Sequence, residues 1–139
     1  PALALAASVE EALKLALVHR QSWWEAVKQK QEFLRQQLAK YPKVHINSPK
    51  DGSPYILNLS VAGVRGQNFQ RLLNEQGICV SVKSACSSDG QPSAAVLALT
   101  HDYWNALSAW RLSLSHLTTE TELQEFLTAF SQCYEKLTK

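Results

Sequence analysis

The chain has 139 residues, of which 45% are hydrophobic and 19% are charged, and this composition predicts one ordinary folded domain rather than a disordered tail. The formal net charge is only +2 and the basic residues are scattered, so the sequence does not indicate nucleic-acid binding. No run of about 18 consecutive apolar residues is present, so no membrane span is predicted.

The first predicted element is a long helix from Ser8 to about Lys40. Ser8 is a suitable N-cap, and Glu10 and Glu11 follow in the first turn, where carboxylates complement the helix dipole. Apolar residues then recur with a period near 3.5, and neither glycine nor proline interrupts the segment before Pro42. A helix of this length in a small chain is expected to span or connect domains.

The rest of the chain interleaves short strands with helices. Alternating apolar and polar residues predict strands at 44–47, 56–61, 78–82 and 110–114. Helices are expected at 66–76, at 93–99 and from the N-cap signal at 118–122 to the C-terminal end. Gly77 is expected to end the first of these helices at the C′ position. The predicted fold class is α+β, a small and mostly antiparallel sheet with helices packed on one side, preceded by the long helix.

Cys86 is the first candidate functional residue, because it lies in a polar loop, rich in small residues, between Ser84 and Pro92. A thiol in such a loop is expected to be exposed and its thiolate accessible. Cys79 and Cys133 lie among apolar residues and are interpreted as buried structural cysteines. An odd number of cysteines without a CxxC pair predicts a reduced, cytoplasmic protein without a zinc site or other metal site.

Arg111 is the second candidate, because it projects from a predicted strand on the face opposite to Trp110 and Leu112. An arginine in this position is commonly solvated or ion-paired, but its planar guanidinium group also suits bidentate binding of a carboxylate. The pattern alone leaves both interpretations open. The histidines have no spaced partner that would form a metal site or a Cys–His pair.

Segments spread over nearly the whole chain resemble, in order, the C-terminal region of the NifS-like cysteine desulfurases, which belong to the class V aminotransferases. Residues 77–88 read GICVSVKSACSS, similar to the family stretch GIAVSSGSACSS. Upstream, residues 56–60 and 63–66 are similar to the family sequence ILNVSF…GVEGE. Downstream, Pro92-Ser93 and the WRLSLSHLTTE sequence at 110–120 parallel the family's PS and LRFSLGRFTTEEE.

The resemblance implies that the chain is the small C-terminal domain of a longer fold-type-I enzyme that uses pyridoxal 5′-phosphate (PLP). Residues 1–41 would be a connector helix, and residues 42–139 would be the α+β small domain. Cys86 would take sulfur from L-cysteine as a persulfide and release L-alanine, and Arg111 would hold the substrate carboxylate. The absence of methionine from the sequence also favours a segment of a longer protein.

The chain departs from the family pattern at several positions. Lys83 and Ser115 stand where the family usually has glycine, and His116 replaces an arginine. The loop between Cys86 and Pro92 is about one residue shorter than usual. No segment matches the family's PLP-anchoring lysine, so we expect no cofactor-binding residue in this fragment, no bound PLP and no activity of the fragment alone.

The resemblance also implies partners for the full-length enzyme. These are L-cysteine, sulfur-acceptor proteins of the iron–sulfur scaffold or tRNA-thiolation type, and a second copy in a homodimer. Two alternatives remain: a degenerate desulfurase-like protein that acts only as a sulfur carrier or binding partner, and a related class V aminotransferase or lyase in which Cys86 is incidental.

Overall fold

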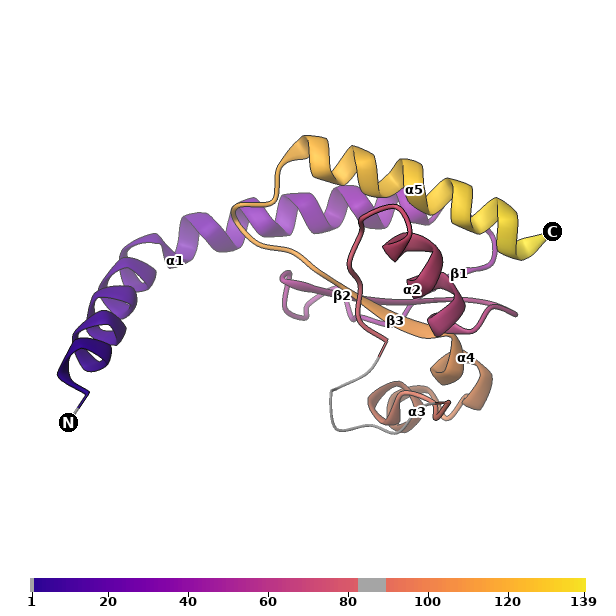
Figure 1. Cartoon of the computed structure of the whole chain (residues 1–139), viewed down its shortest axis with the longest axis horizontal. Coiled ribbons are helices and arrows are strands. Elements are labelled where there is room, and N and C mark those ends of the chain that lie inside the picture. Colours follow the sequence, from indigo (N-terminus) through magenta and orange to yellow (C-terminus); the bar gives the residue numbers. More distant parts are fainter. Residues whose placement is uncertain (1, 83–89) are drawn as a thin grey trace.

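The computed structural model describes residues 2–82 and 90–139, so Cys86 lies outside the described residues. The elements in chain order are α1 (Leu3–Leu38), β1 (Val44–Ile46), β2 (Ile56–Val61), α2 (Gly66–Asn74), α3 (Ala94–Thr100), α4 (Tyr103–Ser108), β3 (Ala109–Ser113) and α5 (Glu120–Thr138). The three strands form an antiparallel sheet with β2 in the centre (Figure 1). The predicted α+β class, with a small antiparallel sheet and a long first helix, is confirmed.

The alternating residues of β2 and β3 divide the sheet into two chemically different faces. Leu57 and Leu59 of β2 are fully buried, and Trp110 of β3, which pairs with Leu59, is also fully buried. Asn58 and Arg111, which pair with each other, project to the opposite face because successive residues of a strand alternate. The strand predicted at 56–61 is therefore confirmed, together with the direction in which Arg111 points.

Three helices cover the apolar face of the sheet. Figure 1 shows α1 and α5 side by side above the sheet, and α2 packs against α5 and β3. The side chains that fill this core include Val27 and Leu34 of α1, Phe69 of α2 and Phe130 of α5, around Trp110. The ring of Phe69 stacks on that of Trp110 with centroids 5.2 Å apart. Burial of each large apolar side chain contributes on the order of 1.5–3 kcal/mol to folding.

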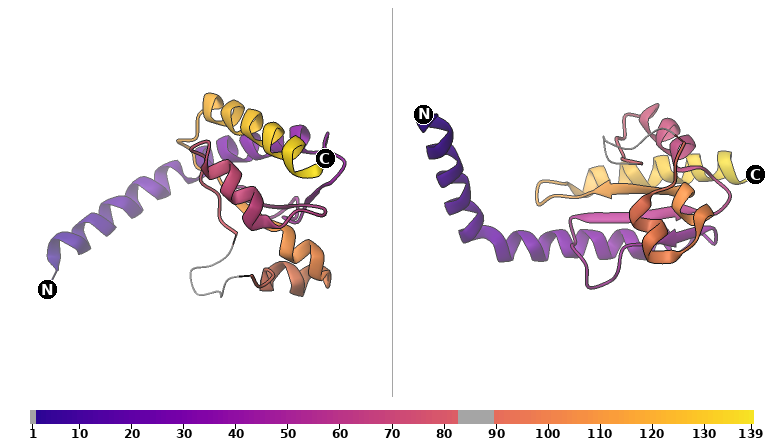
Figure 2. Two further views of the ribbon diagram at one scale, coloured as in Figure 1. Left: turned by 45° about the vertical axis from the view of Figure 1, so that its right-hand side comes forward. Right: turned by 90° about the horizontal axis from the view of Figure 1, so that it is seen from below.

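The long helix α1 begins earlier than expected, at Leu3 rather than at Ser8. Ser8 is not an N-cap; its hydroxyl donates to the carbonyl of Leu5 at 2.8 Å, inside the helix. The alanine and leucine residues before Ser8 are strong helix formers, which accounts for the extension. The first half of α1 projects away from the body of the protein (Figure 2). The buried residues of α1 all belong to its second half, between Val27 and Leu38.

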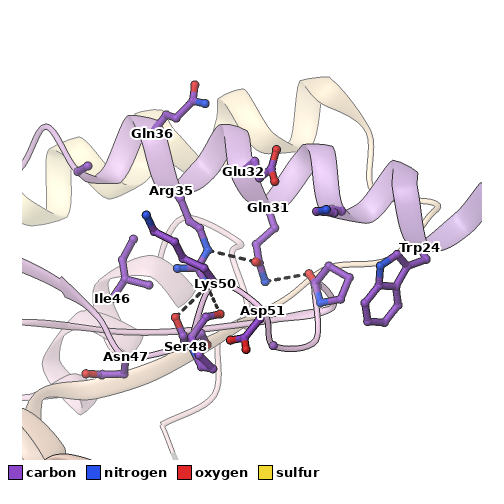
Figure 3. Close-up of a pocket in the computed structure, with 15 residues that line it drawn as sticks. Trp24, Gln31, Glu32, Arg35, Gln36, Ile46, Asn47, Ser48, Lys50 and Asp51 are labelled. Atoms are coloured by element: carbon purple, nitrogen blue, oxygen red, sulfur yellow. Dashed lines mark hydrogen bonds between the residues drawn. The ribbon is translucent and has the colours of Figure 1, made fainter.

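Polar side chains attach the second half of α1 to the turn between β1 and β2. The Gln31 amide, only 5% exposed, donates to the carbonyls of Pro54 at 3.1 Å and of Ile56 at 3.0 Å. The Arg35 guanidinium donates to the carbonyls of Ser48 and Pro49 at 2.9 and 3.0 Å (Figure 3). Partial burial lowers the pKa of Arg35 below its usual value. These hydrogen bonds hold the turn against α1. Gln31, Arg35 and the turn residues line a groove of about 760 Å³.

Helix α2 is bounded by two glycines with different roles. A Cβ atom at Gly66 would lie 2.5 Å from the carbonyl oxygen of Ala109, so the helix begins in direct backbone contact with β3. After the helix, Gly77 has a φ of +78°, and the amides of Gly77 and Ile78 donate to the carbonyls of Asn74 and Leu73, both at 3.0 Å. This is the glycine-terminated helix end that the sequence predicts.

The strand predicted at 78–82 is wrong, apart from a single bridge between Ser81 and Arg111. The Ile78 amide is used by the helix end, and the Val80 carbonyl accepts from the Gln70 side chain at 2.9 Å. The segment is therefore extended but does not run along β3. Ile78 and Val80 pack on the core, which turns Cys79 outward. Cys79 is exposed, contrary to the expectation, whereas Cys133 is buried as expected.

The helices after the Cys86 segment begin at capping side chains. Ser93 caps α3, close to the predicted start, and Asp102 caps α4, a helix that was not predicted from the sequence. Thr119 and Glu122 form a capping box at the start of α5, as its sequence indicates. None of the helices in the described ranges is long and apolar enough to cross a membrane.

Candidate functional site

The face of the sheet away from α1 and α5 carries a line of four polar residues, which we call the polar row: Asn47, Asn58, Arg111 and Ser81. Asn58 pairs with Arg111 in the register of β2 and β3, and Ser81 bridges to the other side of Arg111. The Asn47 amide donates to the Asn58 carbonyl at 2.8 Å, next to β1. Because directly opposed residues share a face of the sheet, the four side chains lie next to one another.

The backbone of Arg111 is held by hydrogen bonds to Ser81, whereas its side chain is exposed. Its amide donates to the Ser81 carbonyl at 2.6 Å, and its carbonyl accepts from the Ser81 amide at 3.0 Å. The side chain is exposed, and within residues 2–82 and 90–139 its guanidinium has neither a hydrogen bond nor an ion pair. No described residue occupies its five N–H donors, and the planar group suits a carboxylate.

A chain of side-chain hydrogen bonds leads into the polar row from α4. Asn105 Nδ2 donates to Asn47 Oδ1 at 2.9 Å, and Asn47 Nδ2 donates to Asn58 Oδ1 at 2.9 Å. The chain begins at Ser60, whose hydroxyl donates to Asn105 Oδ1. Ser60 is 1% exposed and Asn47 is 9% exposed, so this amide chain is held inside the protein. It fixes the orientation of the Asn58 amide.

The segment that carries Cys86 joins the body beside the polar row. Ser81, which is bonded to Arg111, lies one residue before the last described residue of the upstream part, and Cys86 follows Ser81 by five residues. At the other end, the Ser93 amide donates to the carbonyl of Ala106 in α4 at 3.0 Å. The described residues place Arg111 on this face of the sheet, and Cys86 lies outside them.

The sequence pattern does not single out the asparagines of the amide chain, Asn47, Asn58 and Asn105. Asn58 interrupts the apolar residues of β2 with a polar side chain on the same face as Arg111, and this is the only signal that the sequence contains. Asn47 and Asn105 approach Asn58 only in the folded chain.

The chemistry that these groups support is anion binding. The polar row offers a guanidinium, amides and a hydroxyl, and Arg111 is the one charged group within it. Among the described residues, no group of three or more histidine, cysteine, aspartate or glutamate side chains could hold a metal ion. The row is therefore suited to holding a carboxylate rather than to moving protons.

The chain is similar to known sequences that are named NifS-like proteins or cysteine desulfurases. A homolog named NifS/IcsS protein from Lactobacillus delbrueckii subsp. bulgaricus is 33% identical over 140 residues, which covers 99% of this chain and 36% of that protein. A cysteine desulfurase of Cereibacter sphaeroides is 32% identical over 102 residues, or 72% of this chain and 26% of that protein. The chain therefore spans about a third or less of the length of these relatives.

Solved structures are similar as well. A NifS-like protein from Rickettsia africae superposes with a TM-score of 0.73 at 26% identity, over 87% of this chain and 31% of that chain. A second NifS-like protein superposes with a TM-score of 0.79, also at 26% identity, over 91% of this chain and 32% of that one. The family model of the class-V aminotransferases matches residues 1–126. The chain belongs to the class-V aminotransferase family.

Proposed function

We propose that this chain is the C-terminal small domain of a PLP-dependent cysteine desulfurase, with residues 1–41 as the connector helix and residues 42–139 as the small domain. Cys86 accepts the sulfur, and Arg111 holds the carboxylate of the substrate. Relatives named cysteine desulfurase support this function. The observation that carries it is the pair of hydrogen bonds between Ser81 and Arg111, which joins the base of the Cys86 segment to the strand that presents the guanidinium.

The proposed reaction is a balanced sulfur transfer. The Cys86 thiolate attacks the sulfur of L-cysteine, an S–S bond forms and the C–S bond of the substrate breaks. The electron pair of that bond stays on carbon and takes up a proton, so the products are L-alanine and a persulfide on Cys86. The persulfide sulfur then passes to an acceptor protein of the iron–sulfur scaffold or tRNA-thiolation type.

PLP is the cofactor that the family implies, and it would supply the electron sink without which the C–S bond is not labile. The polar row does not fit this group, because it has neither a lysine to anchor the cofactor nor a carboxylate to face its ring nitrogen. PLP would be held by the rest of the longer protein. We therefore expect the isolated chain to be inactive.

The setting of the reaction follows from the same chemistry. Free thiols persist in a reducing compartment, and both Cys79 and Cys133 are free thiols. We propose that the longer protein acts in the cytoplasm, as a homodimer.

The test uses the full-length protein with PLP and L-cysteine, and measures the release of alanine and sulfide. Cys86→Ala is expected to abolish cysteine-dependent release. Cys79→Ala is the matched control, because Cys79 is an exposed cysteine seven residues earlier and is expected to leave turnover unchanged. Turnover that persists in Cys86→Ala would identify an aminotransferase or lyase in which Cys86 is incidental. No turnover by the wild type would identify a degenerate sulfur carrier.

A further inference from the structure

We propose that Asn58 is a second ligand of the carboxylate that Arg111 holds, through its Nδ2 group, and that the amide chain from Ser60 sets its orientation. The inference rests on the proposed function, because it assigns one more binding residue to the same substrate. Its starting point is the register of the sheet, in which Asn58 of β2 and Arg111 of β3 are directly opposed. Directly opposed residues have Cβ atoms about 4.5–5.5 Å apart, so the side chains of Asn58 and Arg111 border the same region on this face of the sheet.

Both side chains present donors to this space. Asn58 uses Oδ1 to accept from Asn47 at 2.9 Å, and no described residue accepts a hydrogen bond from its Nδ2 group. The guanidinium of Arg111 has no acceptor atom, so it is not a partner for Nδ2. Two neighbouring groups that only donate are matched by an acceptor placed between them, and a carboxylate has about four lone-pair sites for this purpose.

The Asn58 amide is also accessible to a ligand. In the described part of the chain, the buried side-chain donor without a hydrogen-bond partner is the Trp110 indole nitrogen, on the other face of the sheet. Asn58 is half-buried, and its Nδ2 atom is not among the buried atoms that lack a partner, so this atom reaches the surface.

The amide chain keeps Nδ2 pointing outward. If the Asn58 amide alone turned over, its NH₂ group would face the NH₂ group of Asn47, and two donors would be left without acceptors. A donor left without an acceptor in the protein interior is unfavourable. Asn47 is held in turn by Asn105, and Asn105 by the fully buried Ser60. The donor is therefore oriented before the substrate arrives, and such preorganisation is what a binding residue needs.

The test compares steady-state kinetics of the full-length, PLP-loaded protein and two variants, Asn58→Asp and Asn58→Ala. The aspartate keeps the acceptor for Asn47 but replaces the free donor with a carboxylate oxygen beside Arg111. Hydrogen bonds to charged groups contribute about 1.5–3 kcal/mol, so we expect the KM for L-cysteine to rise about 10- to 100-fold in Asn58→Asp, with a smaller change in kcat. The inhibition constant of the product L-alanine is expected to rise by the same factor, because L-alanine has the same carboxylate.

Asn58→Ala is expected to raise the KM less than Asn58→Asp does, because it removes the donor without adding a repelling charge. Ser113→Ala is the matched control: Ser113 is an exposed residue two positions after Arg111 on the same face of β3, and this variant is expected to leave the KM unchanged. Arg111→Lys separates the two proposals. If Arg111→Lys raises the KM and the Asn58 variants do not, the role of Asn58 is refuted while the proposed function stands. If the wild type does not convert L-cysteine, both are refuted.

Discussion

Trp23 of α1 and His116, three residues after β3, stack nearly parallel, with ring centroids 4.0 Å apart and 8° between the ring planes. His19 stacks on Trp23 as well, with centroids 5.4 Å apart. Lys30 Nζ donates to the carbonyl of His116 at 2.9 Å. Together these contacts attach the segment between β3 and α5 to the middle of the long helix. His116, which replaces an arginine of the family pattern that the sequence resembles, is thus a structural contact.

Trp23→Ala is expected to lower the stability of the chain by about 1–2 kcal/mol, because stacked aromatic pairs contribute about 0.5–1.5 kcal/mol beyond the area that they bury. Thermal unfolding measures the effect, which corresponds to a decrease in Tm of a few degrees. Trp104→Ala is the control, since Trp104 is 72% exposed and its loss is expected to change the Tm by less than the loss of Trp23. Equal effects of the two substitutions would contradict the role of the stack.

Gln31→Glu is expected to destabilise the chain by about 1–3 kcal/mol, because the new carboxylate keeps the Arg35 partner of Oε1 but has no donor at the Nε2 position. The substitution replaces the Nε2 donor with a carboxylate oxygen that faces the carbonyls of Pro54 and Ile56, so acceptors oppose one another at a buried position. Urea denaturation at neutral pH measures the change in midpoint. Gln36→Glu lies on the same helix and lines the same groove but is exposed, and we expect a change within about 0.5 kcal/mol. A small effect of Gln31→Glu would show that the turn is held without this donor.

The start of α5 is expected to loosen in acid. The Thr119 amide, which donates to the Glu122 carboxylate at 2.7 Å, and the Thr119 hydroxyl lower the pKa of Glu122 below its usual value. A carboxyl whose pKa is lower in the folded state contributes stability above its unfolded pKa, and the contribution disappears as the pH falls through the folded value. An NMR titration is expected to show a midpoint below that of a free glutamate.

Thr119→Ala is expected to shift the Glu122 midpoint upward, because it removes the hydroxyl partner of the carboxylate. Thr121→Ala, two residues along and exposed, is the control and is expected to leave the midpoint in place. An unshifted midpoint in Thr119→Ala would mean that the capping box does not set the acidity of Glu122.

Cys79 and Cys133 are expected to differ strongly in reactivity. Burial raises the pKa of the Cys133 thiol, and Gln76 Nε2 approaches its sulfur at 3.3 Å, whereas Cys79 is exposed. Because the thiolate is the reactive form, native iodoacetamide labelling in a Cys86→Ala background is expected to modify Cys79 at least about tenfold faster. Mass spectrometry of peptides measures the ratio, and denaturation is expected to remove the difference. Comparable native rates would contradict the burial of Cys133.

Local patterns in the sequence predicted the parts of the fold that depend on local physics. The alternation in β2, the glycine at residue 77 and the capping box at Thr119 each depend on a few neighbouring residues, and each appears as expected. The segment at 78–82 has the same alternation as a strand. Its Ile78 amide and Val80 carbonyl are hydrogen-bonded to Leu73 and Gln70 of α2, so most of the segment does not pair with β3. Periodicity alone does not distinguish a strand from an extended segment.

The part of the candidate site that depends on a local pattern was predictable from the sequence. The strand pattern around Arg111 was enough to predict the face on which the guanidinium lies. The importance of Asn58 depends on its register with Arg111 and on contacts with Asn47 and Asn105, which are 11 and 47 residues away along the chain. Relationships of this range are set by the tertiary fold, and a single sequence does not reveal them.

The backbone contact at Gly66 restricts how this family of sequences can diverge. A Cβ atom there would lie 2.5 Å from the Ala109 carbonyl oxygen, and that oxygen belongs to the backbone, so no substitution at position 109 removes the clash. A larger residue at position 66 would require β3, and Arg111 with it, to move relative to α2. Substitution of Gly66 is therefore linked to the placement of the strand that carries Arg111, and viable descendants are expected to retain glycine there even where the surrounding helix sequence has changed completely.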